Sequence, residues 1–267
     1  MAQSVQNFAT PYIVTTGTSH SYALTLGAGV NRKVVIALVT ELYTVVYSNV
    51  AYNGVAATVR VNAGGTGRRI TLYEVDVPDA TGVGSYNVTY DTDVNLEHTG
   101  MAWQSVNSAT GAPEATDSGT ANNTVAIVSG AGMTVTAGSL TVAVAMSASP
   151  AITWDSYGGG IAERTENNET NYTSTSADGV QAGAGSITFS ATASGAAGDK
   201  VIVALSIADG TPAAGFSDRA LSRGVRRGLF RGLANAREMV RDGINGLWLP
   251  KDRRLVIPTG VALEGAH

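Results

Sequence analysis

The chain has 267 residues, no cysteine and a formal net charge of −4, and charged residues make up only 14% of it. The lack of cysteine excludes disulfides, thiolate metal sites and thiol catalysis. The charge is uneven, since residues 1–209 carry 7 Lys/Arg and 16 Asp/Glu (net −9), whereas residues 211–267 carry 10 and 5 (net +5). We therefore expect an acidic body and a basic C-terminal arm that contacts something the body does not.

Residues 1–209 predict an all-β body without helices. Short β-branched runs alternate with Gly, Asn, Asp and Ser turns at intervals of about ten residues, which indicates a sandwich or a barrel. Three runs, 33–40, 139–146 and 200–207, are apolar almost throughout. Such runs are typical of central strands covered on both faces. We interpret them as core strands of one fold and not as evidence of a duplicated domain.

Two segments give sharper local predictions. In the run 69–77, Ile70 and Leu72 share one face of a strand, and the apolar residues lie on the other face from Tyr73 onward. Such a switch fits a bulge or a change of neighbouring strand. Asn53-Gly54 predicts a tight hairpin between strands 45–52 and 55–61, because both residues tolerate positive φ.

The other strand candidates are short. They are 21–26, 85–90, 101–106, 124–128, 133–135, 152–154, 171–174 and 186–193. Two polar stretches, 107–122 and 166–185, are expected to be long loops at the edges of the sheets. About a dozen strands without a helix predict an antiparallel two-sheet β-sandwich of jelly-roll type.

A linker at 210–216 separates this body from an arm at 217–267, where we expect a basic amphipathic helix that starts at Ser217 and then an extended strap. Apolar, basic and glycine residues each recur every four positions, and the apolar and basic stripes lie on opposite faces. Each glycine costs about 1 kcal/mol of helix propensity, so the helix should form on a partner surface. The expected assembly-interface residues are Leu221, Val225, Leu229, Leu233, Arg219, Arg223, Arg227, Arg231, Gly224, Gly228, Gly232 and Trp248.

Several interpretations of the arm stay open. A membrane-surface helix would use Phe230 and Trp248 as anchors, and a nucleic-acid contact would set arginines against phosphates. An assembly arm explains more of the pattern, because the glycine stripe permits close helix approach and arginine pairs with acidic surface on a neighbour. The remaining alternative is a helix folded back on its own body.

Residues with catalytic potential are sparse. The three histidines, His20, His98 and His267, stand in no known catalytic motif. The stretch 64–67 is glycine-rich but lacks the Lys-Ser/Thr of a phosphate-binding loop, which favours a hairpin. Glu163, Glu166 and Glu169 would be the carboxylates of a glycosidase, but their polar surroundings favour a solvated loop.

The sequence also offers a candidate cation site and candidate sugar-binding aromatics. Asp91, Asp93, Asn95 and Glu97 alternate as oxygen ligands do, although a turn whose aspartates bind backbone is the favoured reading. Trp103 and Trp154 lie in strand-like segments and are expected in the core. Five tyrosines are less clearly buried and would contact a sugar or a protein neighbour. They are Tyr12, Tyr43, Tyr47, Tyr157 and Tyr172.

The order of strand patterns over residues 15–208 resembles a β-sandwich domain found in tailed-phage virion proteins and in large bacterial surface proteins. The segments that carry the resemblance are 33–40, 52–56, 70–75, 85–89, 100–103, 139–146 and 200–207. The resemblance implies an appendage or surface role and brings no catalytic residues. The arm after residue 210 matches no family.

We therefore expect a non-enzymatic structural protein of a phage virion, held in the assembly by its C-terminal arm as a capsid decoration, head fibre or tail component. Its expected partners are other virion proteins and further copies of itself, with a trimer as the assumed oligomer. We expect no cofactor, metal, nucleic-acid partner, transmembrane segment or secretion signal. The alternative is a glycan-binding module of a phage tail or bacterial surface protein, and a glycan-degrading enzyme comes third.

Overall fold

The computed structural model of the protein describes residues 3–14, 16–65, 67–150 and 152–210. These residues form nineteen strands and no helix, which confirms the predicted all-β body. The expected helix, strap and assembly-interface residues of the arm lie outside the described residues. In chain order the strands are β1 (Ser4–Val14), β2 (Ser19–Leu26), β3 (Arg32–Thr40), β4 (Tyr47–Tyr52), β5 (Val55–Ala56), β6 (Thr58–Gly65), β7 (Arg68–Val77), β8 (Gly84–Thr92), β9 (His98–Val106), β10 (Ala115–Asn122), β11 (Ala126–Val128), β12 (Met133–Val135), β13 (Leu140–Ser147), β14 (Trp154–Gly158), β15 (Ala162–Asn168), β16 (Thr173–Val180), β17 (Gly185–Ile187), β18 (Ser190–Ala193) and β19 (Asp199–Ile207).

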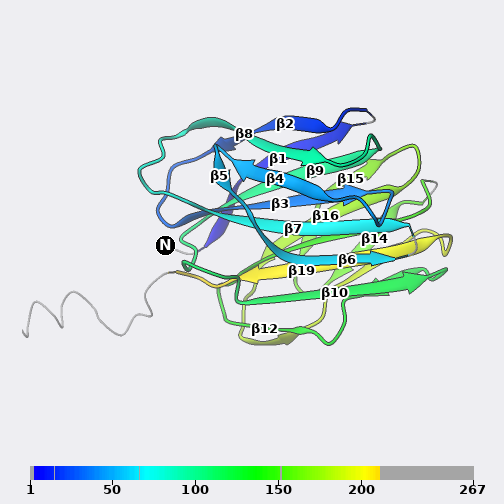
Figure 1. The fold of residues 1–267 in the computed structure, drawn as a ribbon. Helices are drawn as coiled ribbons and strands as arrows, with labels where there is room; N and C mark the ends of the chain where they lie inside the picture. Colours follow the sequence, from blue (N-terminus) through cyan, green and yellow to red (C-terminus); the bar gives the residue numbers. More distant parts are fainter. Residues whose placement is uncertain (1–2, 15, 66, 151, 211–267) are drawn as a thin grey trace, which may run out of the picture. The chain divides into compact units, whose positions relative to one another are not determined.

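The strands of the described chain form five antiparallel sheets, so the predicted pair of sheets is wrong in number. Two five-stranded sheets, β1-β9-β3-β7-β6 and β10-β19-β13-β16-β15, lie at the centre. A four-stranded sheet, β2-β8-β4-β5, covers the first of them, and two small sheets, β11-β18-β14 and β12-β17, cover the second. Figure 1 shows the stack from β2 and β8 at the top to β12 at the bottom.

Three hydrophobic clusters fill the three spaces between these layers. Leu24, Ile36 and Val88 belong to the cluster between the four-stranded sheet and the first central sheet. Trp103 and Val203 belong to the cluster between the two central sheets. A third cluster, with Phe189 and Trp154, lies between the second central sheet and the small sheets. Burial of apolar area of this kind is worth roughly 25 cal/mol per Å².

The strand order of the first half of the body recurs in the second. The central sheets have the same order when β1, β9, β3, β7 and β6 are matched to β10, β19, β13, β16 and β15. The covering sheets match as well, with β11 and β12 in the place of β2, β17 and β18 in that of β8, and β14 in that of β4. The described chain therefore holds two layered halves, β1–β9 and β10–β19, packed through their five-stranded sheets.

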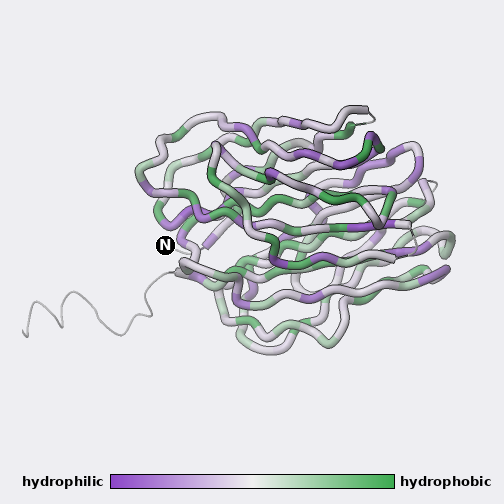
Figure 2. The backbone as a smooth tube through the Cα atoms, viewed as in Figure 1, coloured by the Kyte–Doolittle hydropathy of each residue, from purple (hydrophilic) through white to green (hydrophobic). Residues whose placement is uncertain are grey.

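This duplication corrects the interpretation of the three apolar runs as core strands of a single fold. Strand β3 belongs to the first half, whereas β13 and β19 are neighbours in the second. Every residue of β3 and β13 is buried, which confirms that these strands are covered on both faces. Figure 2 shows the hydrophobic stretches that run along the interior strands.

Two local predictions are confirmed. Asn53 and Gly54 have φ of 49° and 75°, as a tight hairpin between β4 and β5 requires. In β7, Ile70 and Leu72 face the other central sheet, whereas Tyr73, Val75 and Val77 face the covering sheet. The switch of apolar face therefore reflects a strand with a core on each side.

The two expected long loops are wrong, because each contains a strand. Residues 115–122 form β10, and residues 173–180 form β16, of which the first six are buried. The hydroxyl side chains of β16 are short enough for an interior, and some find internal partners. Thr173 donates to the backbone carbonyl of Ser149 at 2.9 Å, and Thr175 to that of Thr165 at 3.0 Å.

Candidate functional site

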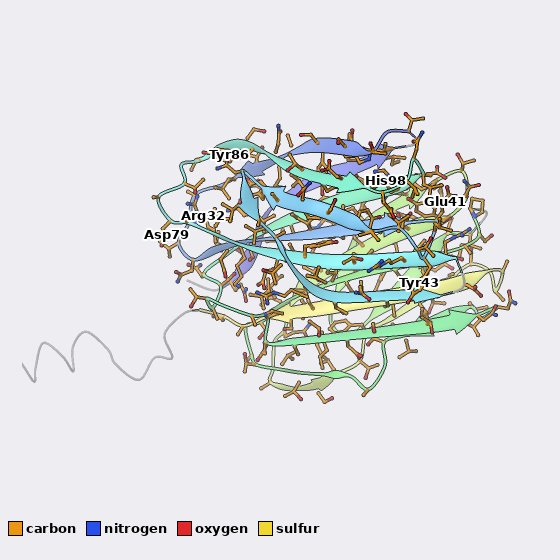
Figure 3. The ribbon with its side chains drawn as sticks, in the orientation of Figure 1. Arg32, Glu41, Tyr43, Asp79, Tyr86 and His98 are labelled. Atoms are coloured by element: carbon orange, nitrogen blue, oxygen red, sulfur yellow. The ribbon has the colours of Figure 1, made fainter. Side chains whose placement is uncertain are left out.

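The loops gather at two opposite ends of the body, and each end holds one of the candidate sites. The Arg32 end comprises loops 27–31, 78–83 and 107–114, and the Tyr43 end comprises loops 41–46, 93–97 and 169–172. Figure 3 shows Arg32 and Asp79 together at one end and Glu41, Tyr43 and His98 at the other. The last described residue, Gly210, donates its backbone N–H to Asn107 at 2.7 Å and so lies at the Arg32 end.

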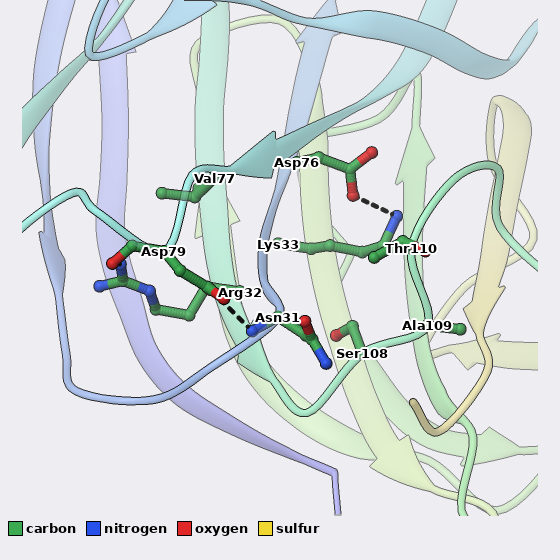
Figure 4. Close-up of a pocket in the computed structure, with 9 residues that line it drawn as sticks. All are labelled: Asn31, Arg32, Lys33, Asp76, Val77, Asp79, Ser108, Ala109 and Thr110. Carbon is green, nitrogen blue, oxygen red and sulfur yellow. Dashed lines mark hydrogen bonds and ion pairs between the residues drawn. The ribbon is translucent and has the colours of Figure 1, made fainter. Parts of the chain in front are cut away.

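A pocket of about 200 Å³ opens at the Arg32 end (Figure 4). Its lining residues are Asn31, Arg32, Lys33, Asp76, Val77, Asp79, Ser108, Ala109 and Thr110. Arg32 is only 3% exposed, and its guanidinium donates to the backbone carbonyls of residues 27, 78, 79 and 81 at 2.6–3.3 Å. Arg32 therefore ties the β7–β8 loop to the β2–β3 loop through its two terminal nitrogens, whereas its Nε has no hydrogen-bond partner among the described residues.

Lys33, the other cation of this pocket, belongs to a buried ion-pair network. Its Nζ lies 2.6 Å from Glu74 and 2.8 Å from Asp76, and it also donates to the carbonyl of Gly111 at 2.5 Å. Arg60 pairs with the second oxygen of Glu74 at 2.7 Å. The side chains of Lys33 and Glu74 are 1% and 0% exposed. Buried charges are tolerated when they are paired in this way, so the network holds the 107–114 loop against the central sheet.

The candidate cation site, against which the sequence favours a turn held by aspartate side chains, does not form among the described residues. Asp91 accepts from Asn49 at 2.7 Å, Asp93 accepts the N–H of Val46 at 3.0 Å, and Asn95 accepts the N–H of Gly17 at 2.6 Å. Each of these three side chains therefore binds a neighbouring segment of the chain through one of its oxygens. Among the residues that the structure describes, no three His, Asp or Glu side chains are placed to hold a metal ion.

Glu97, the fourth residue of that pattern, binds a turn of the second half. Its carboxylate accepts the backbone N–H groups of Thr170 at 2.9 Å and Asn171 at 3.2 Å, and the Asn171 Nδ2 at 3.1 Å. Arg68 strengthens the same junction, because it donates to the carbonyls of Glu41 at 2.6 Å and Asn171 at 3.2 Å. The Tyr43 end is thus built from both halves of the body.

The three glutamates considered as glycosidase carboxylates have different surroundings. Glu163 is exposed and Glu166 half-buried, and both belong to strand β15, not to a loop. Burial raises the pKa of Glu166, whose Oε2 accepts the N–H of Trp154 at 3.2 Å. Burial also raises the pKa of Glu169, which accepts from Thr99 at 2.6 Å. Glu166 and Glu169 therefore hold structural hydrogen bonds.

The aromatic residues considered for sugar binding differ in their exposure to solvent. Trp103 and Trp154 are 0% and 3% exposed, which confirms their place in the core. Tyr172 is fully buried, whereas Tyr43 is 53% exposed in the β3–β4 loop. The other three tyrosines are partly buried and contact neighbours: Tyr12 stacks on Tyr22, Tyr47 lies edge-on to Tyr90, and Tyr157 shares a short hydrogen bond with Thr175.

A buried cluster of histidine and tyrosine at the Tyr43 end was not predicted. His20 on β2 and His98 on β9 have ring centroids 4.2 Å apart, and Tyr90 lies against both at 4.9 and 5.4 Å. Burial lowers the pKa of His98 to about 4. Its Nδ1 donates to the carbonyl of Leu96 at 2.9 Å, and its Nε2 is buried without a hydrogen-bond partner in the part of the chain that the structure describes. The residues are 78 positions apart, so no sequence spacing would have indicated their contact.

The comparisons with known proteins add no relative. No protein family matches the sequence, and neither the curated proteins nor the solved structures contain a match. Within the described part of the chain, no helix has the length and apolar character needed to cross a membrane.

Proposed function

We propose that the protein is a non-enzymatic structural component of a phage virion, in which two jelly-roll halves form a rigid body and the C-terminal arm holds it in the assembly. The observation that carries this proposal is the repeated strand order of the two halves. In each half the first and last strands are neighbours in the five-stranded sheet (β1 and β9, β10 and β19), and a second layer of strands covers that sheet, an arrangement that resembles a jelly roll. This fold is common in viral capsid proteins and in lectins.

The packing of the two halves against each other supports a role in which the body resists deformation. The two central sheets bury a shared cluster that includes Leu72, Trp103, Val144 and Val203, each 0% exposed. Polar bonds between the halves, such as those of Glu97 and Thr99, add to this cluster. Protein interiors packed to this degree transmit force with little deformation, which suits a particle surface.

The acidic charge of residues 1–209 and the basic charge of residues 211–267 support self-association or binding to acidic neighbours through the arm. The expected assembly residues, among them Leu229, Arg227 and Gly228, are those of the stripe pattern. Partners are other virion proteins and further copies of the chain.

Immunogold labelling of purified phage particles with antibodies against residues 1–210 tests the proposal. We expect gold at a defined position, on the head or the tail, and a fixed ratio of this chain to the major capsid protein in the same particles. Particles that carry neither the label nor the chain would overturn the virion assignment.

A further inference from the structure

Tyr43 is an exposed aromatic residue, and its ring packs against the backbone of a glycine, Gly64. The ring lies so close to Gly64 on β6 that a Cβ there would stand 2.1 Å from Cδ2 and 2.4 Å from Cε2 of the ring. The tyrosine nevertheless remains 53% exposed. A ring fixed against backbone on one side and open to solvent on the other is pre-organised to stack on a ligand, with little loss of side-chain entropy on binding.

A shallow pocket of about 230 Å³ is lined in part by the loop that carries Tyr43, although the Tyr43 side chain itself is not among the lining residues. Glu41, two residues before Tyr43, lines it together with Asn95, Leu96, Glu97, Thr170 and Asn171. The hydrogen bonds of Glu97 and Arg68 described above fix the relative positions of the three loops that form this pocket. The shape of the pocket is therefore fixed by hydrogen bonds between its loops.

The side-chain groups that these hydrogen bonds leave free for a ligand are either uncharged and polar or acidic. Asn95 uses its oxygen on Gly17, which leaves its Nδ2 donors, and Asn171 uses its Nδ2 on Glu97, which leaves its oxygen. Thr170 and Asn171 are exposed, and Glu41 is half-exposed; its Oε1 accepts the backbone N–H of Glu97 at 3.4 Å, which leaves its Oε2 for a ligand. Carboxylate and amide oxygens accept the hydroxyl protons of a sugar, an amide NH₂ donates to its oxygens, and an aromatic ring receives the apolar face of a pyranose.

We propose that Tyr43 and this pocket form a binding site for a neutral oligosaccharide, with Tyr43 as the stacking platform and Glu41 as the principal acceptor of sugar hydroxyls. Glu41 and Glu97 give the site a negative charge, which disfavours sialylated or other anionic glycans. Pockets for drug-sized ligands measure roughly 300–1,000 Å³, so this one fits the terminal one or two units of a chain. The tyrosines that the sequence left as equal candidates are thereby reduced to one.

The site lies at the end of the body opposite to Gly210 (Figure 3). The proposal stands apart from the virion assignment, because sugar binding by the free protein tests it without reference to any particle.

The experiment is a binding screen of the full-length chain on an array of neutral hexose- and N-acetylhexosamine-containing oligosaccharides, with a sialylated set beside them. Calorimetry on the best neutral glycan then compares variants. We expect Tyr43→Ala to weaken binding about tenfold or more and Tyr43→Phe to stay within about threefold, since the ring supplies the stacking energy. Glu41→Gln should weaken binding several-fold. Val83→Ala, which changes a residue 67% exposed at the Arg32 end, is the matched control and should leave binding unchanged.

Thermal melts of all variants separate lost binding from lost folding, and Tyr43→Phe with Glu41→Gln keeps the test valid if Tyr43→Ala unfolds. The proposal is overturned if no neutral glycan binds the intact chain above background, if the sialylated set binds better, or if Tyr43→Ala and Glu41→Gln bind as the wild type does.

Discussion

Thr99 on β9 donates its hydroxyl to the carboxylate of Glu169 across 2.6 Å, and this bond joins the two halves of the body. The same hydroxyl lies 2.9 Å from the phenol oxygen of Tyr172. Thr99 and Tyr172 are 0% exposed and Glu169 is 6% exposed. A buried carboxylate depends on such partners, because its other oxygen has no hydrogen-bond partner among the described residues.

Replacement of Thr99 by valine, which keeps the shape of the side chain, removes this donor. We expect Thr99→Val to lower the free energy of unfolding by about 1–3 kcal/mol, because it leaves a buried acceptor unsatisfied. Thr58→Val on the exposed strand β6 is the control and should change it by less than about 0.5 kcal/mol. Urea unfolding of both variants measures the change in the free energy of unfolding. An unchanged value for Thr99→Val would show that the Thr99 bond does not stabilise the contact between the halves.

The fully buried network of Lys33 and the partly exposed pair of Arg164 with Asp178 offer a direct comparison of two ion pairs. Lys33→Met leaves Glu74 with only Arg60 in a site that is 0% exposed, and we expect a loss of about 3–5 kcal/mol. Arg164→Met breaks a bidentate pair with Asp178 in which the arginine is 40% exposed and the carboxylate 7% exposed, and we expect a smaller loss of about 1–2 kcal/mol, because water can reach the site from the arginine side. Chemical denaturation checks both values, and a reversed order would contradict the burial of the network.

Acid should destabilise the body through His98. Its folded pKa of about 4 lies below the unfolded value of 6.5, so the unfolded chain binds the proton first. The stabilising effect of the neutral ring is complete above pH 6.5 and is lost as the pH falls towards 4, with about 3 kcal/mol at stake. His20, whose pKa burial also lowers, acts in the same direction.

His98→Asn removes the titrating group while it keeps a donor for the carbonyl of Leu96. We expect this variant to be less stable than the wild type at pH 7 but to lose less stability between pH 6.5 and 4. Melting temperatures across that range provide the measurement. A pH slope unchanged by the substitution would assign the acid sensitivity to another group.

Gly64 is predicted to be required for the position of Tyr43. A Cβ at residue 64 would stand 2.1 Å from the tyrosine ring and 2.6 Å from the carbonyl oxygen of Arg68. Because the second contact is with backbone, Gly64→Ala should cost about 1–3 kcal/mol of stability and should weaken any glycan binding at Tyr43. Gly183→Ala, where nothing lies within 4 Å of the new Cβ, is the matched control. Tyrosine fluorescence and melting curves of the two variants test the contact.

The sequence predicted the elements whose side chains are strongly apolar or have special backbone preferences. The covered runs of β3, β13 and β19, the Asn53-Gly54 turn and the burial of Trp103 and Trp154 all follow from local patterns. Strand β16 was predicted only at its start, in the candidate 171–174, because its other buried residues include hydroxyl side chains such as Thr175 and Ser176, which are typical of loops. The duplication was missed for a related reason, since polar strands like β10 do not resemble their counterparts in the first half.

The candidate sites depend on contacts between distant parts of the chain, which a sequence pattern does not contain. Tyr43 and Tyr172 looked equivalent, yet one is 53% exposed and the other 0%. The difference arises because Tyr172 lies between the central sheets, whereas Tyr43 rests on Gly64, which is 21 positions later in the chain. Asp91 and Asp93 had the right residue types for a cation, but the side-chain amide of Asn49 binds Asp91 and the backbone N–H of Val46 binds Asp93.

The most direct test of the account is the copy number of this chain in purified particles when residues 211–267 are deleted. Quantitative mass spectrometry compares phage grown with the intact chain and phage grown with residues 1–210 alone, and near-ultraviolet circular dichroism first shows that the shortened chain is folded. We predict a fixed copy number per particle for the intact chain and near-complete loss of the shortened one. Equal incorporation of the shortened chain would contradict the role assigned to the arm, and absence of the intact chain would contradict the virion assignment itself.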